Sequence, residues 1–403
     1  MSEMPIVMEK MSMMPIIIDN GSGYSKNGFA GEEIPQSVFP TLVGYPKEND
    51  DLVERAYYVG KEAMEHQQAY DLNLVKPIEH SLIWDWEALE KIWHYTFFRD
   101  LRVDPTNHPV LLMFTERTLN TSPPWERIVE IMFETFNVPA LYITFTSALS
   151  LYACGLSTGL IVDIGAQLMQ IVPIYEGYSL SHAICHVDLA GHDLTNYLNR
   201  LLRLRGYNFV TPMERETVRD IKEQLCYVAL DPEKELMRLK KAGGISKQYM
   251  LPNGAPLTLD HERFEVPEVL FNPAIIGQDH PPLHELIFET IEKCDPDLQV
   301  DLFRNIVLVG GSTLFDGLKE RLTQELNNLI SDSYFAESKI ISGSSNYDRV
   351  EGDKIVAPPN RHHIAWTGGS ILGSDLSLEK WVTKQDYINE GAAIIHRYST
   401  GGF

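Results

Sequence analysis

The chain has 403 residues and a formal net charge of −22, with 44% hydrophobic and 22% charged residues. This length exceeds what a single hydrophobic core usually serves, so we expect two domains of moderate size. The strong negative charge disfavours nucleic acid and anionic membrane surfaces as partners and favours basic proteins. A solvated acidic surface without any partner is the simpler explanation of the same charge.

A predicted strand of three consecutive isoleucines near the N-terminus runs directly into a glycine-rich turn. In this turn Gly21 and Gly23 let backbone N–H groups approach an anion, and Ser22 adds a hydroxyl donor. Lys26 follows where its ammonium reaches a phosphate, and Asp19 ends the strand within reach of a hydrated metal. Most glycine-rich turns are only turns, so the motif alone predicts phosphate binding weakly.

The same pattern returns later in the chain, where a second apolar run leads to Asp163 and Gly165. A third apolar run ends in the glycine pair Gly310 and Gly311. Two strand-aspartate-glycine units far apart in the sequence indicate a duplicated pair of domains. Their two turns would face each other across a cleft, with an aspartate from each near a metal.

Strand and helix patterns alternate along the rest of the chain, which predicts the α/β class. Predicted helices cover residues 86–99, 123–136, 147–154, 193–205, 213–230, 283–293 and 315–329, and one helix pair begins at 364. Predicted strands cover residues 110–114 and 141–145, and a hairpin covers 171–184. The polar segment 331–353 is predicted to be an exposed loop insertion.

The four cysteines lie too far apart in sequence for a C-x-x-C metal or redox pair, which favours free thiols in a reducing compartment. Residues 1–15 are predicted to be a flexible tail. This tail is rich in methionine but carries charges, so we expect neither a signal peptide nor a membrane anchor. No apolar run approaches membrane-spanning length, and we expect a soluble intracellular protein.

Short segments spread in order over nearly the whole chain resemble actin and the actin-related proteins. They are residues 19–23, 28–31, 77–80, 90–94, 101–103, 131–136, 149–152, 172–178, 188–191, 218–223, 368–372 and 396–397. The resemblance implies duplicated actin-like, ribonuclease H-like ATPase domains that form four subdomains around a cleft for ATP or ADP with Mg or Ca. The implied first domain is 16–155 plus 364–403, with a small subdomain at about 41–77, and the second is 156–363, with a small subdomain at about 191–270 and the insertion at about 331–353.

When the functional residues of the family are matched one by one to this sequence, the resemblance implies that the nucleotide-binding half of the site is mostly present. The first phosphate turn is intact and is followed by Tyr24, and Asp19 and Asp163 match the two aspartates that hold the water shell of the metal. The other matching positions are Gly165, Gly191, Arg219, Lys222, Glu223, Gly310, Gly311, Phe315 and His362. His362 stands where the family usually has a lysine. Without the family match, the charged helix residues would simply be a solvated face with salt bridges.

The half of the site that would hydrolyse ATP departs from the family. In the second phosphate turn Ala166 has lost a carboxylate, and Gln167 replaces a glycine. Thr146 replaces the glutamine that helps to position the attacking water, and Gln170 replaces the histidine associated with that water. Hydrolysis needs a water held in line and polarised, so we predict nucleotide binding with little or no hydrolysis and name no catalytic residue. The alternative, that Thr146 or Gln170 still suffices, stays open.

Surfaces that make polymer and partner contacts in the family also differ. Where actin carries an apolar plug, residues 47–55 form a shorter and charged loop, and burying its carboxylates unpaired would be costly. Asp375 lies where the family has a leucine in the groove for actin-binding proteins, although Tyr152, Tyr178 and Leu372 still match that groove.

We therefore predict a structural, nucleotide-holding subunit of a cytoskeletal or ciliary assembly in the cytoplasm. The expected partners are other subunits of a cytoskeletal or axonemal complex, with actin as a further candidate, and neither nucleic acid nor a membrane. An active filament-forming ATPase is the first alternative. A nuclear chromatin-remodelling subunit is the second, disfavoured because no basic nuclear-localisation run is visible. A sugar kinase on the same duplicated fold is the weakest, because no sugar-binding aspartate can be named.

Overall fold

The computed structural model describes residues 14–47, 55–117, 124–242, 246–332, 355–375 and 381–398. Three predicted features lie wholly or mostly outside these ranges: the N-terminal tail, the charged loop at 47–55 and the insertion at 331–353. None of the helices within the described ranges is long and apolar enough to cross a membrane.

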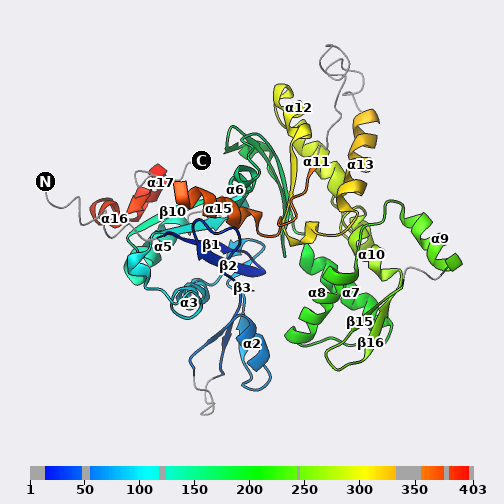
Figure 1. Cartoon of the computed structure of the whole chain (residues 1–403), viewed down its shortest axis with the longest axis horizontal. Coiled ribbons are helices and arrows are strands. Elements are labelled where there is room, and N and C mark those ends of the chain that lie inside the picture. The colour runs from blue at the N-terminus through cyan, green and yellow to red at the C-terminus, as the bar shows by residue number, and fades with distance from the viewer. Residues whose placement is uncertain are drawn as a thin grey trace.

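Two β-sheets carry the fold, and Figure 1 shows helices grouped around each of them. The first sheet has the order β19 (Val382–Thr383), β10 (Ala140–Phe145), β9 (Val110–Phe114), β1 (Ile16–Asn20), β2 (Tyr24–Phe29) and β3 (Ser37–Pro40). The second has the order β13 (Tyr178–Ser179), β12 (Met169–Tyr175), β11 (Gly159–Ile164), β17 (Ile306–Val309) and β18 (Ile355–Val356), with β14 (Cys185–Val187) paired to β12. The predicted α/β class is confirmed.

The two sheets repeat one local topology, which is the duplication that the sequence predicts. In the first sheet β1 pairs with β2 as an antiparallel hairpin and with β9 in parallel. In the second, β11 pairs in the same way with β12 and with β17. Asp19 and Asp163 occupy equivalent positions in these units, each near the carboxyl end of its strand. The domain boundaries stay predictions.

Helices surround both sheets. Around the first sheet lie α3 (Trp86–Tyr95), α5 (Pro124–Glu130), α15 (Ile364–Asp375), α16 (Lys384–Glu390) and α17 (Ile395–Tyr398). Around the second lie α7 (Gly191–Leu204), α8 (Pro212–Leu225), α9 (Pro232–Ala242), α10 (Glu262–Glu268), α11 (Leu283–Glu292), α12 (Pro296–Arg304) and α13 (Leu318–Asp332). We call these groups, each with its sheet, the first lobe and the second lobe. Helix α6 (Thr146–Ala153) follows β10 and leads to β11.

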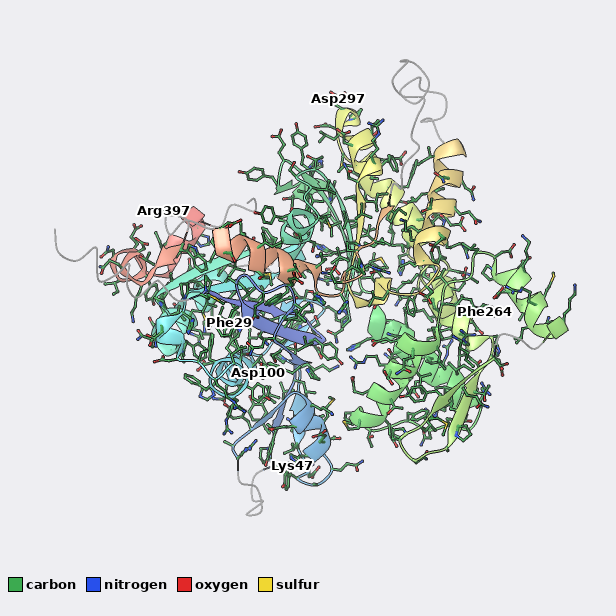
Figure 2. All side chains as sticks on the ribbon, in the orientation of Figure 1. Phe29, Lys47, Asp100, Phe264, Asp297 and Arg397 are labelled. Atoms are coloured by element: carbon green, nitrogen blue, oxygen red, sulfur yellow. The ribbon has the colours of Figure 1, made fainter. Side chains whose placement is uncertain are left out.

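Smaller elements extend both lobes. In the first, β4 (Val43–Tyr45), β5 (Tyr58–Val59) and β6 (Asn73–Val75) form a sheet beside α2 (Lys61–His66), and β7 (Ile78–Glu79) pairs with β8 (Leu82–Ile83). In the second, β15 (Lys247–Met250) pairs with β16 (Pro256–Leu259). Short 3₁₀ turns cover Pro105–Asn107, Ser181–Ala183, Pro273–Ile276, Gly311–Thr313 and Ala392–Ile394. Figure 2 labels Lys47, just beyond the end of β4 in the first lobe, and Phe264 of α10 in the second.

The three consecutive isoleucines of β1 are explained by burial on both faces of the first sheet. Ile16 and Ile18 pack in one cluster with α3 and α5, and Ile17 packs in another with Trp366 of α15. Successive side chains of a strand point to opposite faces, so a strand covered on both sides needs apolar residues throughout. This burial fixes the strand that ends at Asp19.

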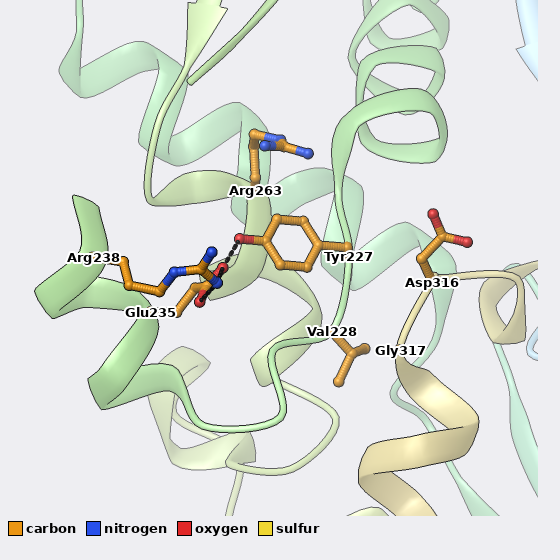
Figure 3. Close-up of a pocket in the computed structure, with 7 residues that line it drawn as sticks. All are labelled: Tyr227, Val228, Glu235, Arg238, Arg263, Asp316 and Gly317. Carbon is orange, nitrogen blue, oxygen red and sulfur yellow. Dashed lines mark hydrogen bonds and ion pairs between the residues drawn. The ribbon is translucent and has the colours of Figure 1, made fainter. Parts of the chain in front are cut away.

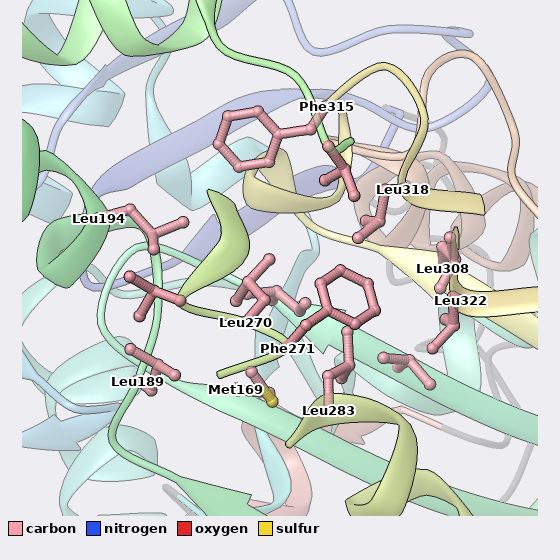
Figure 4. Close-up of a cluster of buried hydrophobic side chains, with 14 of the residues drawn as sticks. Met169, Leu189, Leu194, Leu270, Phe271, Leu283, Leu308, Phe315, Leu318 and Leu322 are labelled. Carbon is pink, nitrogen blue, oxygen red and sulfur yellow. The ribbon is translucent and has the colours of Figure 1, made fainter. Parts of the chain in front are cut away.

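A larger cluster of apolar side chains forms the core of the second lobe. Figure 4 shows Met169 of β12 and Leu308 of β17 surrounded by leucines of α7, α11 and α13. This core covers the face of the second sheet that carries Val162 and Ile164. It thereby holds the strand of Asp163 as firmly as the first core holds that of Asp19.

Several predicted element boundaries were wrong. The helix predicted over 86–99 ends at Tyr95 and continues as a π-helix, Thr96–Asp100. The helix predicted over 123–136 likewise becomes a π-helix at Ile131–Thr135. Within the predicted hairpin, a 3₁₀ turn follows Ser179.

The helix predicted over 213–230 ends at Leu225, because the backbone N–H groups of Tyr227 and Val228 donate to carbonyls of distant segments. The helix predicted over 315–329 begins at Leu318 and runs to Asp332, so it takes in the first two residues of the predicted insertion. Helices α2, α9, α10 and α12 and the β15–β16 hairpin were not predicted.

Helices α6 and α15 cross so closely that glycine is required at their contact. A Cβ built on Gly368 would lie 2.0 Å from the carbonyl oxygen of Leu149. The same helix is anchored to β1 by Trp366, whose Nε1–H donates to the carbonyl of Ile17 at 3.2 Å. Helix α6 also packs against β11, so this crossing connects the first sheet to the second.

We expect Gly368→Ala to lower the free energy of unfolding by about 3 kcal/mol, since α6 and α15 must separate to admit the methyl group. The better helix propensity of alanine would offset only about 1 kcal/mol of the strain. Urea unfolding of the variant measures the change. Ile371→Ala, at a half-exposed position of the same helix, is the control and should cost clearly less. Equal losses in the two variants would contradict the close-crossing argument.

Candidate functional site

The two glycine-rich turns meet face to face. A Cβ built on Gly23 would lie 2.6 Å from the Cβ of Ala166, so the turns are in direct contact. Each turn is closed by a backbone bond at its first glycine, from Gly21 to Tyr24 at 3.0 Å and from Gly165 to Leu168 at 2.9 Å. The predicted pair of opposed turns is therefore present.

Side chains beneath the first turn hold it rigidly. Asn20 accepts a hydrogen bond from Nε1–H of Trp93 at 2.7 Å and donates to Oγ of Ser25 at 2.9 Å. Ser22 Oγ accepts from the backbone N–H of Ser81 at 3.1 Å. These bonds are buried and satisfied, so the turn keeps its shape without a ligand.

Two aspartates and one lysine form the charged centre between the turns. Lys26 Nζ lies 2.6 Å from Oδ2 of Asp19, which is 5% exposed. Asp163 stays partly accessible to solvent, yet the protein around it raises the pKa of its carboxyl to about 6. Burial is the largest cause, the charge of Lys26 opposes the rise, and the charge of Asp19 adds to it. Two carboxylates thus share one ammonium.

Glycine at position 310 lets the third predicted motif close on this centre. Gly310 has a φ of +89°, and a Cβ there would lie 2.5 Å from Oδ1 of Asp163. A side chain would therefore both strain the backbone and displace the carboxylate. Gly311 follows at the exposed start of the Gly311–Thr313 turn.

Behind the second turn, Lys222 and Gly191 are locked together. Lys222 is 3% exposed, and its Nζ donates to the carbonyl of Gly191 at 2.9 Å. Burial lowers the pKa of this ammonium to about 8. The N–H of Gly191 donates to the carbonyl of Gly165 at 3.1 Å, and Ser312 Oγ donates to the same carbonyl at 2.9 Å. A buried cation therefore stands next to the second turn.

Tyr24 reaches from the first turn to helix α8. Its hydroxyl donates to Oε2 of Glu216 at 3.0 Å, and the guanidinium of Arg219 lies 4.7 Å from its ring centroid. Arg219 also forms ion pairs with Glu216 at 2.8 Å and with Glu223 at 3.8 Å. Burial raises the pKa of Glu216 to about 6. The structure thus brings Arg219 and Glu223 to the edge of the site through Tyr24.

Two predicted adenine-side residues differ in their surroundings. The side chain of His362 is exposed at the surface. The protein that encloses part of its ring still lowers its pKa, and the nearby charges of Lys26 and Arg361 add to this effect. Phe315 is 7% exposed and packs in the core cluster of the second lobe, as Figure 4 shows. Its place is thus a packing position, and the predicted contact with a base stays a prediction.

The residues that replace the water-positioning groups are both buried, Gln170 beside Asp163 and Thr146 just after β10. Gln170 is 1% exposed, and its Nε2 lies 3.5 Å from Oδ2 of Asp163. Thr146 follows β10 at the same sheet edge where Glu116 follows β9. Within the described residues, Gln170 Oε1, Thr146 Oγ1 and Glu116 Oε2 are buried without a hydrogen-bond partner. Because such atoms are costly to leave unpaired, we expect ordered water beside them.

A hydrated divalent cation and a polyphosphate fit these residues. Asp19 and Asp163 offer hard oxygen atoms whose shared negative charge Lys26 only half neutralises. No group of three or more His, Cys, Asp or Glu side chains in the described ranges is arranged to hold a metal directly. That arrangement suits an ion held through its own water shell and by phosphate oxygens.

Sequence reasoning missed Glu116, Arg117, Asp188, Glu216 and the role of His80 in this region. Glu116 and Arg117 follow β9, which pairs in parallel with the strand of Asp19. Charged residues just beyond a buried parallel strand are the signal that could have found them, because parallel strands end at one sheet edge.

A separate cavity of about 340 Å³ lies at the foot of α9 (Figure 3). None of its lining residues is a predicted site residue; they are Tyr227, Val228, Glu235, Arg238, Arg263, Asp316 and Gly317. Within this cavity Glu235 accepts from the Tyr227 hydroxyl at 2.8 Å and from Arg238 at 3.0 Å. The cavity is therefore distinct from the centre between the turns.

Comparison with known families adds one finding to this geometry. A family model described as Actin matches residues 10–400. The match includes both turns, the charged centre and helix α8. Proteins of that family generally bind a nucleotide together with a divalent metal.

The fully buried Glu116 yields a pH-dependent prediction. Burial raises the pKa of its carboxyl from 4.5 to about 8, so the folded protein keeps this proton longer than the unfolded chain does. Stability is then lost as the pH rises from about 4.5 to 8. We expect Glu116→Gln to remove that loss, with a gain of up to about 1.4 kcal/mol for each pH unit of the window.

Urea unfolding of wild type and Glu116→Gln at pH 5, 7 and 8.5 measures this gain. Glu87→Gln, an exposed substitution, controls for the removal of one negative charge from an acidic protein. A difference between wild type and Glu116→Gln that does not change with pH would show that Glu116 does not titrate as burial demands.

Proposed function

Because the chain belongs to the actin family, as its resemblance predicted, we propose that it binds ATP or ADP with a divalent cation as a structural ligand and hydrolyses it very slowly or not at all. The observation that carries the proposal is the chemistry of the buried residues that replace the water-positioning groups. The carboxamide of Gln170 and the hydroxyl of Thr146 are buried with oxygens that lack a partner among the described residues. Neither group can take a proton from water.

The opposed turns and the charged centre support nucleotide binding. Backbone N–H groups of the two turns and the ammonium of Lys26 would face the phosphates, and Asp19 and Asp163 would hold the water shell of the cation. The cation, when bound, would neutralise phosphate charge. Arg219 and Glu223 would face the ribose and base. Lys222 would hold Gly191 and so orient the second turn rather than contact the phosphates.

The chemistry of these buried side chains supports slow hydrolysis. Activating a water requires a group that accepts its proton or aligns it for in-line attack. A carboxamide has no basic nitrogen, and the short side chain of Thr146 extends less far than a glutamine would. Glu116 holds its own proton near neutral pH, since burial raises its pKa to about 8. None of Thr146, Gln170 and Glu116 is therefore ready to accept a proton from a water near Asp163.

A nucleotide that is not turned over suits a structural subunit. We propose that the chain serves a cytoplasmic cytoskeletal or ciliary assembly through contacts with other subunits, and with actin as a candidate. The net charge of −22 supports basic protein surfaces as partners over nucleic acid or membrane. Asp375, which ends α15, adds a charge where the resemblance implies an apolar groove.

Two measurements on the purified full chain test this proposal. Denaturation followed by anion-exchange chromatography identifies any retained ATP or ADP, and a phosphate-release assay measures turnover. We expect about one nucleotide per chain and no phosphate release above the background rate.

Affinity purification of the tagged chain then identifies its partners. Pelleting of the chain alone in polymerising salt, with rapid phosphate release, would support the filament-forming ATPase instead. Co-purification with chromatin-remodelling subunits would support the nuclear alternative.

Restoring the two family residues should restore turnover. We expect Thr146→Gln with Gln170→His to raise phosphate release at least about tenfold, because a base and a longer amide then face the water near Asp163. Adding Asp163→Asn should abolish the gain while leaving the two restored residues in place. An unchanged rate in a folded, nucleotide-loaded double variant would place the cause of slow hydrolysis elsewhere.

A further inference from the structure

Two separate sets of side-chain contacts join the lobes across the site. The first, which we call the Tyr24 brace, consists of Tyr24 of the first lobe with Glu216 and Arg219 of the second. The Tyr24 hydroxyl donates to Glu216 at 3.0 Å, and the Arg219 guanidinium lies over the ring at 4.7 Å. The ion pair of Arg219 with Glu216 at 2.8 Å closes this triangle.

The second set, which we call the Arg117 brace, consists of Arg117 and His80 of the first lobe with Asp188 and Gln167 of the second. Arg117 Nη1 lies 2.5 Å from Oδ1 of Asp188, and His80 Nδ1 lies 3.4 Å from the same oxygen. The backbone N–H of His80 donates to Oε1 of Gln167 at 3.0 Å. Its ring nitrogen Nδ1 also lies 2.9 Å from the carbonyl of Gln167.

Both braces act directly on the phosphate turns. Tyr24 is the next residue after Gly23, and Gln167 follows Ala166, which touches Gly23. The side chain of Gln167 is 8% exposed and makes a bond that a glycine at this position could not make. The two turns are thereby tied to the opposite lobe by contacts that need no ligand.

The two lobes also approach each other at a place other than the turns. Helix α2 of the first lobe also lies close to α8, the helix that carries Glu216 and Arg219. A ligand held between the turns can leave only if the lobes separate there. Separation must break each cross-lobe hydrogen bond and ion pair before water replaces it, so these contacts belong to the barrier for exchange.

We propose that the Tyr24 and Arg117 braces hold the lobes closed over the nucleotide and make its exchange slow. Tyr24, Arg117 and Gln167 are then positioning residues for retention. This inference rests on the proposed nucleotide binding and adds to it the reason why the ligand stays. Because the two sets share no residue, their contributions should multiply in the rate of release.

Exchange of etheno-ATP from the full chain tests the braces. The protein is loaded with this fluorescent analogue and mixed with excess ATP, and the fall in fluorescence gives the dissociation rate. We expect Tyr24→Phe, which loses only the hydroxyl, and Arg117→Ala each to raise this rate about fivefold, as expected for one lost hydrogen bond or partly exposed ion pair. The double variant should release about 25-fold faster.

Two control substitutions, matched to Tyr24→Phe and Arg117→Ala, remove comparable contacts that lie within the first lobe. Tyr57→Phe removes a hydroxyl bonded to His94 at 2.9 Å, and Arg127→Ala removes an ion pair with Glu130 at 3.4 Å. Both should release etheno-ATP at the wild-type rate. Equal acceleration by these controls would contradict the proposal.

The association rate separates a brace from a merely damaged site. Since the braces also close the empty cleft, their loss should speed association as well, and Kd should change less than the dissociation rate. A variant that loses affinity without associating faster would contradict the brace role. If Arg117→Ala fails to fold, two other variants still test the proposal. They are the nearly isosteric Tyr24→Phe and Gln167→Gly, which removes the bond to His80.

Failure of the two proposals can be told apart. Wild-type chain that neither retains nucleotide nor binds etheno-ATP would overturn the proposed function. Wild-type chain that binds etheno-ATP, with brace variants that release it at the wild-type rate, would overturn the braces alone.

Discussion

Two carboxylates and a single ammonium at the ends of two buried strands set the main constraint on this molecule. Asp19 and Asp163 face the same space, and Lys26 pairs with Asp19 at 2.6 Å. The pKa of Asp163 rises to about 6 because burial is only partly offset by that lysine. An enclosed negative charge of this kind is stabilised by a cation, and a cation held through water in turn attracts phosphate. The surrounding glycines follow from the same constraint, since any side chain at Gly310 would displace the Asp163 carboxylate.

The fold supplies what this charged centre needs. Both strands that carry the aspartates are buried on two faces, and each continues into a turn of fixed shape. The α6–α15 crossing, which tolerates no methyl group at Gly368, connects the sheet of Asp19 to that of Asp163. The distance between the two carboxylates therefore depends on packing far from the site. A small change at that crossing should therefore alter the charged centre as well as the stability.

Retention and hydrolysis make different demands on the same cleft. Retention needs opposed donors and a barrier to opening, which the turns and the cross-lobe contacts of Tyr24 and Arg117 provide. Hydrolysis needs a base and an aligned water, and Gln170, Thr146 and the protonated Glu116 are neutral groups. Gln167, at a position where the family has a glycine, bonds to His80 of the other lobe at 3.0 Å and so serves retention. Slow exchange would then come from the cross-lobe contacts, and slow turnover from Gln170 and Thr146.

The amino-acid sequence by itself determined the α/β class, the duplication and most of the strands and helices that frame the site. It did so because strand patterns, glycine turns and family motifs are local features. It also identified Asp19, Lys26, Asp163 and Gly310, which the structure brings together. Other features depended on tertiary contacts. The end of α8 at Leu225 was decided by backbone bonds to distant carbonyls, and the core position of Phe315 by packing of the second lobe.

The contacts across the cleft could not be read from the sequence at all. Arg117 and Asp188 are 71 residues apart, and Tyr24 and Glu216 are 192 apart. The residues around one member of such a pair do not indicate the other member, because the two meet only when the two sheets face each other. Local sequence thus specified the two phosphate turns and their aspartates, and only the tertiary structure decided how the two lobes that carry them are held together.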